Sequence, residues 1–453
     1  MDAGRRRSRT DEHRKDLGRV TGLRCVVIGG GVAGLWTAWG LAEVGFSVTV
    51  LEAGKAGSGA SWGNAGWVCP AQAGPLPEPG IIAHGFKTMA KKDSALHFTP
   101  AAALRLGPWI ARFAKHCNEH DYDKGVAAFS ALGYPSFKLI EDLGLDEHVD
   151  KTGLLAISNS RQDVEKFVDK IAPLAGFGQT VSEVLVGDAV QDVDPVVPRG
   201  QSAVLLSDHW QIVPHTYTAA LLEKVRAAGV EVLEDQPVIS FDARDGFVQG
   251  VRTGSRRFAT DRVVIASGAS AAHFTRQLGF PLPLTGGKGY SIDVRPGRMP
   301  RQAIDSLDSH VALSPMGQRM RIVGGMDFSN SPGRIPPGRV KSLRRSAERI
   351  VGPWTDESRP WAGLRPVAPD GLPLLGRLDP RSNAYVASGY SMLGMTISPA
   401  AGIHLAEAIA SGDDGTTGPF SPQRFRRRRW ANRLDAAALD RAGPGAPHPG
   451  FRP

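Results

Sequence analysis

Three glycines near the start of the chain have the spacing of a nucleotide-binding turn. Gly29, Gly31 and Gly34 satisfy the pattern Gly-x-Gly-x-x-Gly, with Val32 and Ala33 between the last two. The first glycine permits a tight turn, the second lets a pyrophosphate approach the backbone at a helix N-terminus, and the third lets that helix pack on a sheet. The pattern therefore indicates a dinucleotide bound by backbone amides.

An acidic residue and two apolar segments complete this pattern. Residues 24–28 and 47–51 read as buried strands and residues 32–44 as a helix between them, which together make a β-α-β unit. Glu52 follows the second strand, eighteen residues after Gly34. Its carboxylate is placed to accept hydrogen bonds from ribose hydroxyls and would repel a 2′-phosphate.

Helices and strands alternate along the rest of the chain. Because 453 residues exceed what one hydrophobic core normally organises, we expect two interleaved domains. The periodicity predicts helices at 101–118, 126–143, 214–228 and 400–410, strands at 230–233, 262–266 and 384–387, a hairpin of 247–253 with 257–260, and mostly extended chain at 290–325.

Five later segments carry motifs that point to a family. They are GASWGNAG at 59–66, RVVIASGA at 262–269, KGYS at 288–291, WAGLRP at 361–366 with PDGLP at 369–373, and SGY at 388–390 with GMT at 394–396. In this order and spacing they resemble the D-amino acid oxidase superfamily, and in particular its bacterial D-amino acid dehydrogenase branch. The resemblance spans residues 23–412 and is specific because the motifs occur in combination.

The resemblance implies an α/β fold, in which a Rossmann-like FAD-binding domain interleaves with an α+β substrate domain built around an antiparallel sheet. It implies residues 20–75, 207–282 and 361–415 for the FAD-binding domain, and 76–206 and 283–360 for the substrate domain. Residues 1–19 and 416–453 are expected to be basic, flexible tails. The predicted FAD-binding residues are Gly29, Gly31, Val32, Ala33, Gly34, Glu52, Ala53, Ser61, Asn64, Ala65, Gly66, Val238, Ser267, Gly268, Gly363, Gly389, Gly394, Met395 and Thr396.

Three residues near the predicted flavin bear on how it is held and what it accepts. Tyr390 stands where family members often have His, and Met395 stands where the dehydrogenases often have Trp. Both positions flank the flavin, so they bear on substrate and acceptor preference. Cys69 is the one nearby candidate for a covalent link, and the resemblance implies no such link there. We therefore expect non-covalent FAD.

Oxidation of an α-amino acid needs an electron sink, a carboxylate anchor and a neutral amine. Arginine suits the anchor because its planar fork matches a carboxylate, and the resemblance places Arg365 beside the substrate. The alternative for Arg365 is a structural ion pair. Lys288 could hold a water at the flavin, stabilise charge on the reduced flavin, or be a strand-end surface lysine. Tyr290 could line the pocket or serve only in aromatic packing.

The resemblance implies FAD-dependent oxidative deamination of a small D-amino acid to a 2-oxo acid and ammonia, by hydride transfer from the α-carbon to flavin N5. Electrons would then pass to a quinone or another carrier, or to oxygen. Alternatives on the same scaffold are an oxidase or dehydrogenase of glycine, sarcosine, D-proline or hydroxy-D-proline, and the flavin subunit of an opine dehydrogenase. A more distant alternative is a non-catalytic flavin-binding regulatory protein.

The charge distribution limits the partners. The net charge of +9 comes from the two ends, because residues 1–19 carry +3 and residues 416–453 carry +6, whereas the body is neutral. A neutral body argues against a nucleic-acid partner, and the basic ends could contact an anionic membrane surface. Three cysteines without metal or disulfide spacing predict no metal and a reducing compartment. The sequence thus predicts a cytoplasmic protein, with the inner face of the membrane within reach of its tails.

Overall fold

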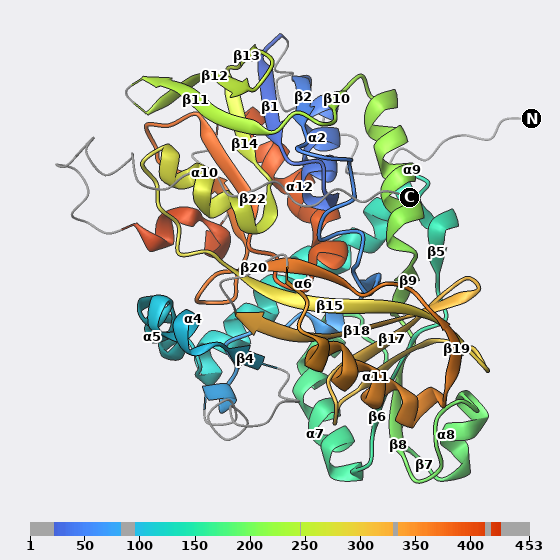
Figure 1. Cartoon of the computed structure of the whole chain (residues 1–453). Coiled ribbons are helices and arrows are strands. Elements are labelled where there is room, and N and C mark those ends of the chain that lie inside the picture. The colour runs from blue at the N-terminus through green and yellow to red at the C-terminus, as the bar shows by residue number, and fades with distance from the viewer. Residues whose placement is uncertain (1–21, 83–95, 245, 329–333, 413–417, 427–453) are drawn as a thin grey trace, which may run out of the picture.

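The computed structural model describes residues 22–82, 96–244, 246–328, 334–412 and 418–426. In Figure 1 the upper half is a parallel sheet with its helices, and the lower half is a larger, mostly antiparallel sheet. The strands β15 (Thr285–Pro296) and β20 (Trp361–Val367) run across the middle between the two halves. This arrangement confirms the predicted α/β class with a Rossmann-like part and a second, sheet-based part.

The Rossmann-like sheet has six strands, of which five are parallel. Its order is β10 (Glu231–Leu233), β2 (Ser47–Leu51), β1 (Arg24–Ile28), β14 (Arg262–Ile265), β22 (Ala384–Ser388) and β21 (Leu374–Arg377), and only β21 is antiparallel to its neighbour. The central strands are buried on both faces, which explains why they read as continuous apolar runs. Their carboxyl ends meet at one edge, where the loops that follow can share a ligand.

Helices cover one face of this sheet and smaller elements cover the other. The first core packs α2 (Val32–Glu43), α6 (Glu119–Asp142), α9 (Pro214–Ala227) and α12 (Gly394–Ser411). The second core packs α10 (Ala271–Gln277) and a three-stranded sheet of β11 (Val238–Arg244), β12 (Phe247–Thr253) and β13 (Arg257–Ala259). The predicted hairpin is therefore confirmed as β12 and β13.

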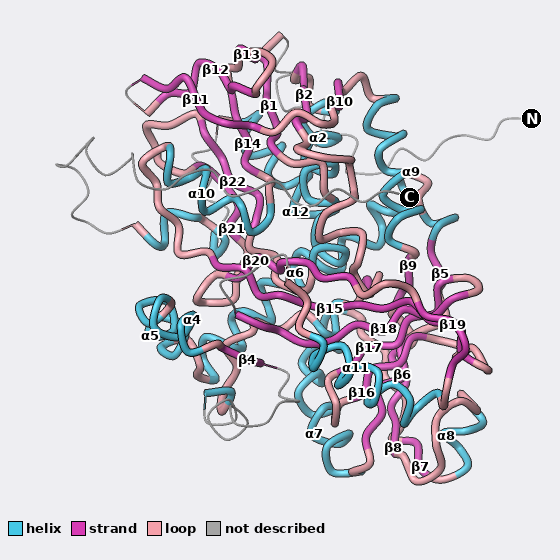
Figure 2. Tube along the Cα trace, viewed as in Figure 1, coloured by secondary structure: helices cyan, strands magenta, loops and turns pink. Residues whose placement is uncertain are grey.

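The large sheet forms the second half of the molecule, and Figure 2 shows its strands in magenta below β20. Its main path is β19 (Trp354–Glu357), β15, β18 (Arg319–Phe328), β17 (Val311–Met316), β16 (Ala303–Ser306), β6 (Leu154–Ser158), β8 (Ser202–Leu206) and β7 (Leu185–Val186), while β20 pairs with β15 and β4 (Leu96–Phe98) with β18. Helix α11 (Pro337–Val351) packs on one face of this sheet. The opposite face is the one that meets the cofactor half.

The remaining described elements are short, and they complete the cover of the two sheets. They are β3 (Trp67–Val68), η1 (Pro70–Gln72), α4 (Pro100–Arg105), α5 (Gly107–Lys115), η2 (Asp146–His148), β5 (Val149–Asp150), α7 (Arg161–Ile171), η3 (Ala172–Phe177), α8 (Asp188–Val193), β9 (Trp210–Ile212), η4 (Gly268–Ser270), η5 (Gly418–Phe420) and η6 (Pro422–Phe425). No helix within the described ranges combines the length and apolar character needed to cross a bilayer.

The segment of residues 418–426 packs against the Rossmann-like part. The predicted tail 416–453 begins as packed chain, because Phe420 is buried, Arg424 pairs with Asp370 at 2.6 Å and Arg426 with Asp379 at 2.7 Å. Packed chain therefore continues at least to residue 426, and residues 1–21 and 427–453 lie outside the described residues. The domain limits stay predictions, although β20, placed with the FAD-binding part, pairs with β15 in the large sheet.

Candidate active site

The glycine turn between β1 and α2 is built so that its first and third glycines accept no side chain. Gly29 has φ +109°, and a Cβ there would lie 2.7 Å from the carbonyl oxygen of Ala266. A Cβ on Gly34 would lie 1.9 Å from the carbonyl oxygen of Gly29. Gly31 is the N-cap of α2. The turn thus presents a helix N-terminus at the carboxyl edge of the sheet, which is where a pyrophosphate binds.

Glu52 lies at the same edge, directly after β2. Its carboxylate accepts hydrogen bonds from the backbone N–H groups of Gly30, at 2.7 Å, and Gly54, at 2.9 Å. A carboxylate has about four acceptor positions, so capacity for a ribose hydroxyl remains after these two bonds. Glu52 therefore fixes the geometry of the glycine turn as well as offering the ribose contact that its position predicts.

Replacing Glu52 with alanine is expected to weaken FAD binding by about 1.5–3 kcal/mol, because a charge-assisted hydrogen bond to ribose is lost. Turnover at saturating FAD should change little. Titration of apoprotein with FAD measures this change. FMN, which lacks the adenosine ribose, is the control ligand, and its affinity should be unaffected. An equal loss for FAD and FMN would assign Glu52 only to the architecture of the turn.

The loop of residues 59–66 is held against α2 and the large sheet. The Ser61 hydroxyl accepts from Val32 N–H at 3.1 Å, so it meets the first turn of α2. Asn64 Oδ1 accepts from Gly66 N–H at 2.7 Å and shapes the turn. Ala65 contributes its carbonyl oxygen to the Gln211 side chain at 3.0 Å. These hydrogen bonds fix the predicted loop residues next to the glycine turn.

Arg321 was missed by sequence reasoning, although it ties this loop to the large sheet. It is almost fully buried and forms a two-bond pair with Asp293, with Nε–Oδ1 at 2.7 Å and Nη2–Oδ2 at 2.9 Å. Its Nη1 donates to the carbonyl oxygens of Trp62 and Asn64. The sequence does not single out Arg321, because β18 also carries Arg319 and Asp327, and Trp62 and Asn64 lie far away along the chain.

Three hydroxyl groups at the carboxyl edge of the Rossmann-like sheet are buried without hydrogen-bond partners in the described residues. They belong to Ser267, which follows β14, and to Tyr390 and Ser391, which follow the neighbouring strand β22. Buried polar groups are normally satisfied, so a cluster of unsatisfied ones indicates a place for a polar ligand. These hydroxyls and the α2 N-terminus fit a large dinucleotide cofactor such as FAD.

The other predicted cofactor residues surround this edge. Gly268 accepts from the Ser388 hydroxyl at 2.9 Å, and the turn that contains Gly389 contacts β20 because Ser391 N–H donates to the Pro366 carbonyl. In the first turn of α12, a Cβ on Gly394 would lie 3.8 Å from Val32 of α2. The remaining predicted residues are Ala33 in α2, Ala53 after β2, Val238 at the start of β11, Gly363 in β20, and Met395 and Thr396, whose side chains are buried in α12.

Arg365 lies on the face of the large sheet that meets the cofactor half. In the register of β15 and β20, Gly287 is opposite Arg365 and Gly289 is opposite Gly363, and opposite residues share a face. The guanidinium lies over Gly289, where an added Cβ would be 2.5 Å from Cζ, and Nη1 donates to the Gly325 carbonyl at 2.6 Å. The glycine at 289 thus leaves the room that the arginine head occupies.

The charge of Arg365 has no counter-ion within the part of the chain that the structure describes. The side chain is partly buried, and this burial lowers its pKa to about 10, although Asp327 acts in the opposite direction. No carboxylate among the described residues forms a salt bridge with it. A partly desolvated cation without a counter-ion attracts an anion, so this geometry favours an anionic ligand at Arg365 over a structural ion pair.

Lys288 and Tyr290 lie on the opposite face of the sheet, because they alternate with Gly287 and Gly289 along β15. Lys288 Nζ donates to the Arg334 carbonyl at 2.7 Å, and burial lowers its pKa. The Tyr290 hydroxyl donates to Asp327 Oδ2 at 2.7 Å. Burial, reinforced by Asp327, raises the pKa of Tyr290. The structure therefore does not bring these two predicted catalytic residues together with Arg365.

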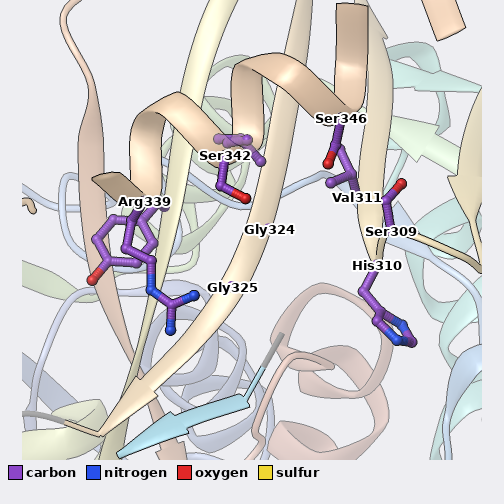
Figure 3. Close-up of a pocket in the computed structure, with 10 residues that line it drawn as sticks. Ser309, His310, Val311, Gly324, Gly325, Arg339, Ser342 and Ser346 are labelled. Atoms are coloured by element: carbon purple, nitrogen blue, oxygen red, sulfur yellow. The ribbon is translucent and has the colours of Figure 1, made fainter. Parts of the chain in front are cut away.

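Figure 3 shows the small pocket on this opposite face, between α11 and β18. Arg339, Ser342 and Ser346 project from α11 above Gly324 and Gly325 of β18. Arg339 Nε donates to Asp327 Oδ2 at 3.0 Å, so the Tyr290–Asp327 contact is part of a buried charged network. Asp327 and Arg339 are further residues that sequence reasoning missed. Across the residues the structure describes, no three His, Cys, Asp or Glu side chains gather as a metal site.

Comparisons with known proteins agree with this geometry. Residues 24–408 match the family model described as FAD dependent oxidoreductase. The chain belongs to this family. It is similar to the D-amino acid dehydrogenase of Helicobacter pylori, with 27% identity over 394 residues, 85% of this chain and 95% of that relative. The D-amino acid dehydrogenase of Agrobacterium fabrum is 27% identical over 402 residues, 86% of this chain and 96% of that relative.

A solved structure supports the fold in the same way. The glycine oxidase from Bacillus cereus superposes with a TM-score of 0.65 at 20% identity, over 87% of this chain and 97% of that one. The two proteins thus share one fold, which in this chain consists of a Rossmann-like sheet and a large mixed sheet. The predicted resemblance and the fold class are both confirmed.

Proposed function

We propose that the protein catalyses the oxidative deamination of a D-amino acid to a 2-oxo acid and ammonia, with non-covalently bound FAD. The observation that carries the proposal is the partly buried guanidinium of Arg365, which has no carboxylate partner among the described residues and lies on the face toward the cofactor half. Substrates with a carboxylate beside the reacting carbon suit such a group. The relatives named D-amino acid dehydrogenase support the same class of substrate.

The cofactor would be held by the residues at the edge of the Rossmann-like sheet. The α2 N-terminus would meet the pyrophosphate and Glu52 the adenosine ribose, while the turn at Tyr390 and Ser391 would meet the flavin end. When bound, FAD supplies the electron acceptor that no side chain can provide. Burial raises the pKa of the Cys69 thiol to about 12, which leaves it a poor nucleophile and supports non-covalent attachment.

The protein's own residues bind and orient the substrate. Arg365 would take the substrate carboxylate in a bidentate pair, which fixes the direction of the Cα–H bond relative to the cofactor edge. The Gly325 carbonyl holds one guanidinium nitrogen at 2.6 Å and therefore sets the orientation of the fork. Lys288 and Tyr290, on the other face, would act only by supporting the sheet. Electrons would then leave to a quinone or another carrier.

A panel of D- and L-amino acids tests the proposal, assayed with an artificial dye and separately with oxygen. We expect turnover with D-amino acids, little with their L-enantiomers, and faster turnover with dye than with oxygen. The released keto acid and ammonia should appear in equal amounts. A protein that turns over only L-amino acids, or only amines without a carboxylate, would contradict the proposed function.

A further inference from the structure

The sheet face that carries Arg365 continues across four more strands to a partly buried carboxylate, that of Asp305. Trp361, four residues from Arg365 along β20, pairs with Ser291. Ser291 pairs with Val323, Val323 with Ala312, and Ala312 with Asp305. Because opposite residues share a face and every second residue of a strand returns to it, Asp305 lies on the same face as Arg365.

Asp305 has a single polar contact within the described residues. Gln72 Nε2 donates to its Oδ2 at 2.7 Å. No lysine, arginine or histidine among those residues pairs with it, and burial raises its pKa to about 6. The side chain is nevertheless only partly shielded from solvent, as is that of Ala312 beside it. Asp305 and Ala312 are therefore not sealed in the core, and a polar group of a ligand could reach the carboxylate.

We propose that Asp305 binds a cationic group at the end of the substrate's side chain, so that the enzyme prefers basic D-amino acids. This inference rests on the proposed function and extends it to a substrate class. Arg365 and Asp305 are opposite charges on one face, and each lacks a counter-ion among the described residues. A substrate with a carboxylate at one end and a cation at the other would neutralise both.

The spacing of the two groups suits an extended side chain. The guanidinium of Arg365 is bound at Gly325 on β18, and Asp305 is on β16, two strands away. Gly325 is also two residues along β18 from Val323, which is aligned with Asp305 across the sheet through Ala312 of β17. With about 4.8 Å between strands and about 3.4 Å per residue, the Cα atoms of Gly325 and Asp305 are about 12 Å apart. An extended lysine or arginine with a hydrogen bond at each end spans a gap of that order.

A different role for Asp305 would be to tie η1 to β16 through Gln72. The two roles predict different results for Asp305→Asn, because an asparagine can still accept the hydrogen bond from Gln72 but carries no charge. A structural tie would survive the substitution, or would fail with an equal effect on all substrates. Recognition of a cation would fail selectively for the basic ones.

The test uses the FAD-loaded enzyme with matched substrates. D-lysine is paired with its neutral analogue D-norleucine, and D-arginine with D-citrulline. We expect the wild type to prefer the basic member of each pair, and Asp305→Asn to lower kcat/KM for that member by about 10- to 100-fold, the loss of one charge-assisted contact. The kcat/KM for the neutral members should change less than about threefold, which is the usual range for a substitution that removes no contact.

Asp305→Glu supplies a second, independent readout, because it keeps the charge and lengthens the side chain by one methylene. The preference should shift from D-lysine toward the shorter D-ornithine. Wild-type enzyme that oxidises neutral and basic substrates equally would overturn the assignment of Asp305 but leave the proposed function intact. An enzyme that oxidises no D-amino acid would overturn both.

Discussion

Arg365→Ala is expected to lower kcat/KM for D-amino acids by about two to four decades, a loss of about 3–5 kcal/mol in transition-state stabilisation. The substitution removes a bidentate partner and leaves the substrate carboxylate in a partly desolvated space. Arg365→Lys should recover only part of this, because an ammonium lacks the planar fork. Steady-state kinetics with the best substrate of the D-amino acid panel measures the effect.

Three controls separate anchoring from architecture. FAD content and melting temperature of Arg365→Ala should stay near those of the wild type. Arg344→Ala should leave kcat/KM unchanged, because Arg344 lies on α11 and is paired with Glu357 of β19. Amines without a carboxylate should be poor substrates for the wild type and lose little further in the mutant. If activity on amines with and without a carboxylate falls together and flavin is lost, Arg365 is structural.

Gly34→Ala is expected to raise the dissociation constant for FAD by at least about tenfold, since backbone shifts forced by overpacking cost about 1–3 kcal/mol. The new Cβ would lie 1.9 Å from the Gly29 carbonyl oxygen, and no rotamer relieves a clash between a Cβ and the backbone. The turn must open, and the pyrophosphate site opens with it. Absorbance of the bound flavin in purified protein, followed by FAD titration, reports the change.

Gly338→Ala is the matched control, because nothing lies within 4 Å of a Cβ at that position on α11. It should retain wild-type FAD content. Gly34→Ala protein that binds FAD as tightly as the wild type would show that the turn tolerates the shift, and would remove the argument that this glycine shapes the cofactor site.

The cofactor half of the fold was predictable because its signals are local. The glycine turn, the strand-like runs and Glu52 lie within about thirty residues, the scale of one β-α-β unit. Helix limits were less certain. Helix α12 was expected from residue 400 but begins at Gly394 and continues through Pro399, where packing against α2 outweighs the usual effect of proline. Helix α6 begins at Glu119, capped by Asn118, seven residues before its predicted start.

The substrate side was less predictable because it depends on pairing between distant strands. The motif KGYS lies close to the cofactor segments in the family pattern, which suggested roles for Lys288 and Tyr290. The register of β15 with β20 decides which face each residue takes, and it directs both away from Arg365. Arg321 and Asp305 were invisible for the same reason, since the contacts of Arg321 with Trp62 and of Asp305 with Gln72 each join residues more than two hundred positions apart.

Anaerobic mixing of the FAD-loaded protein with a single D-amino acid isolates the proposed reduction of the flavin by substrate. The oxidised-flavin absorption should bleach in a single turnover, the L-enantiomer should cause no bleaching on the same time scale, and Arg365→Ala should slow the bleaching by the factor seen in kcat/KM. Flavin that stays oxidised with every D-amino acid, in protein that retains FAD, would contradict the proposed function.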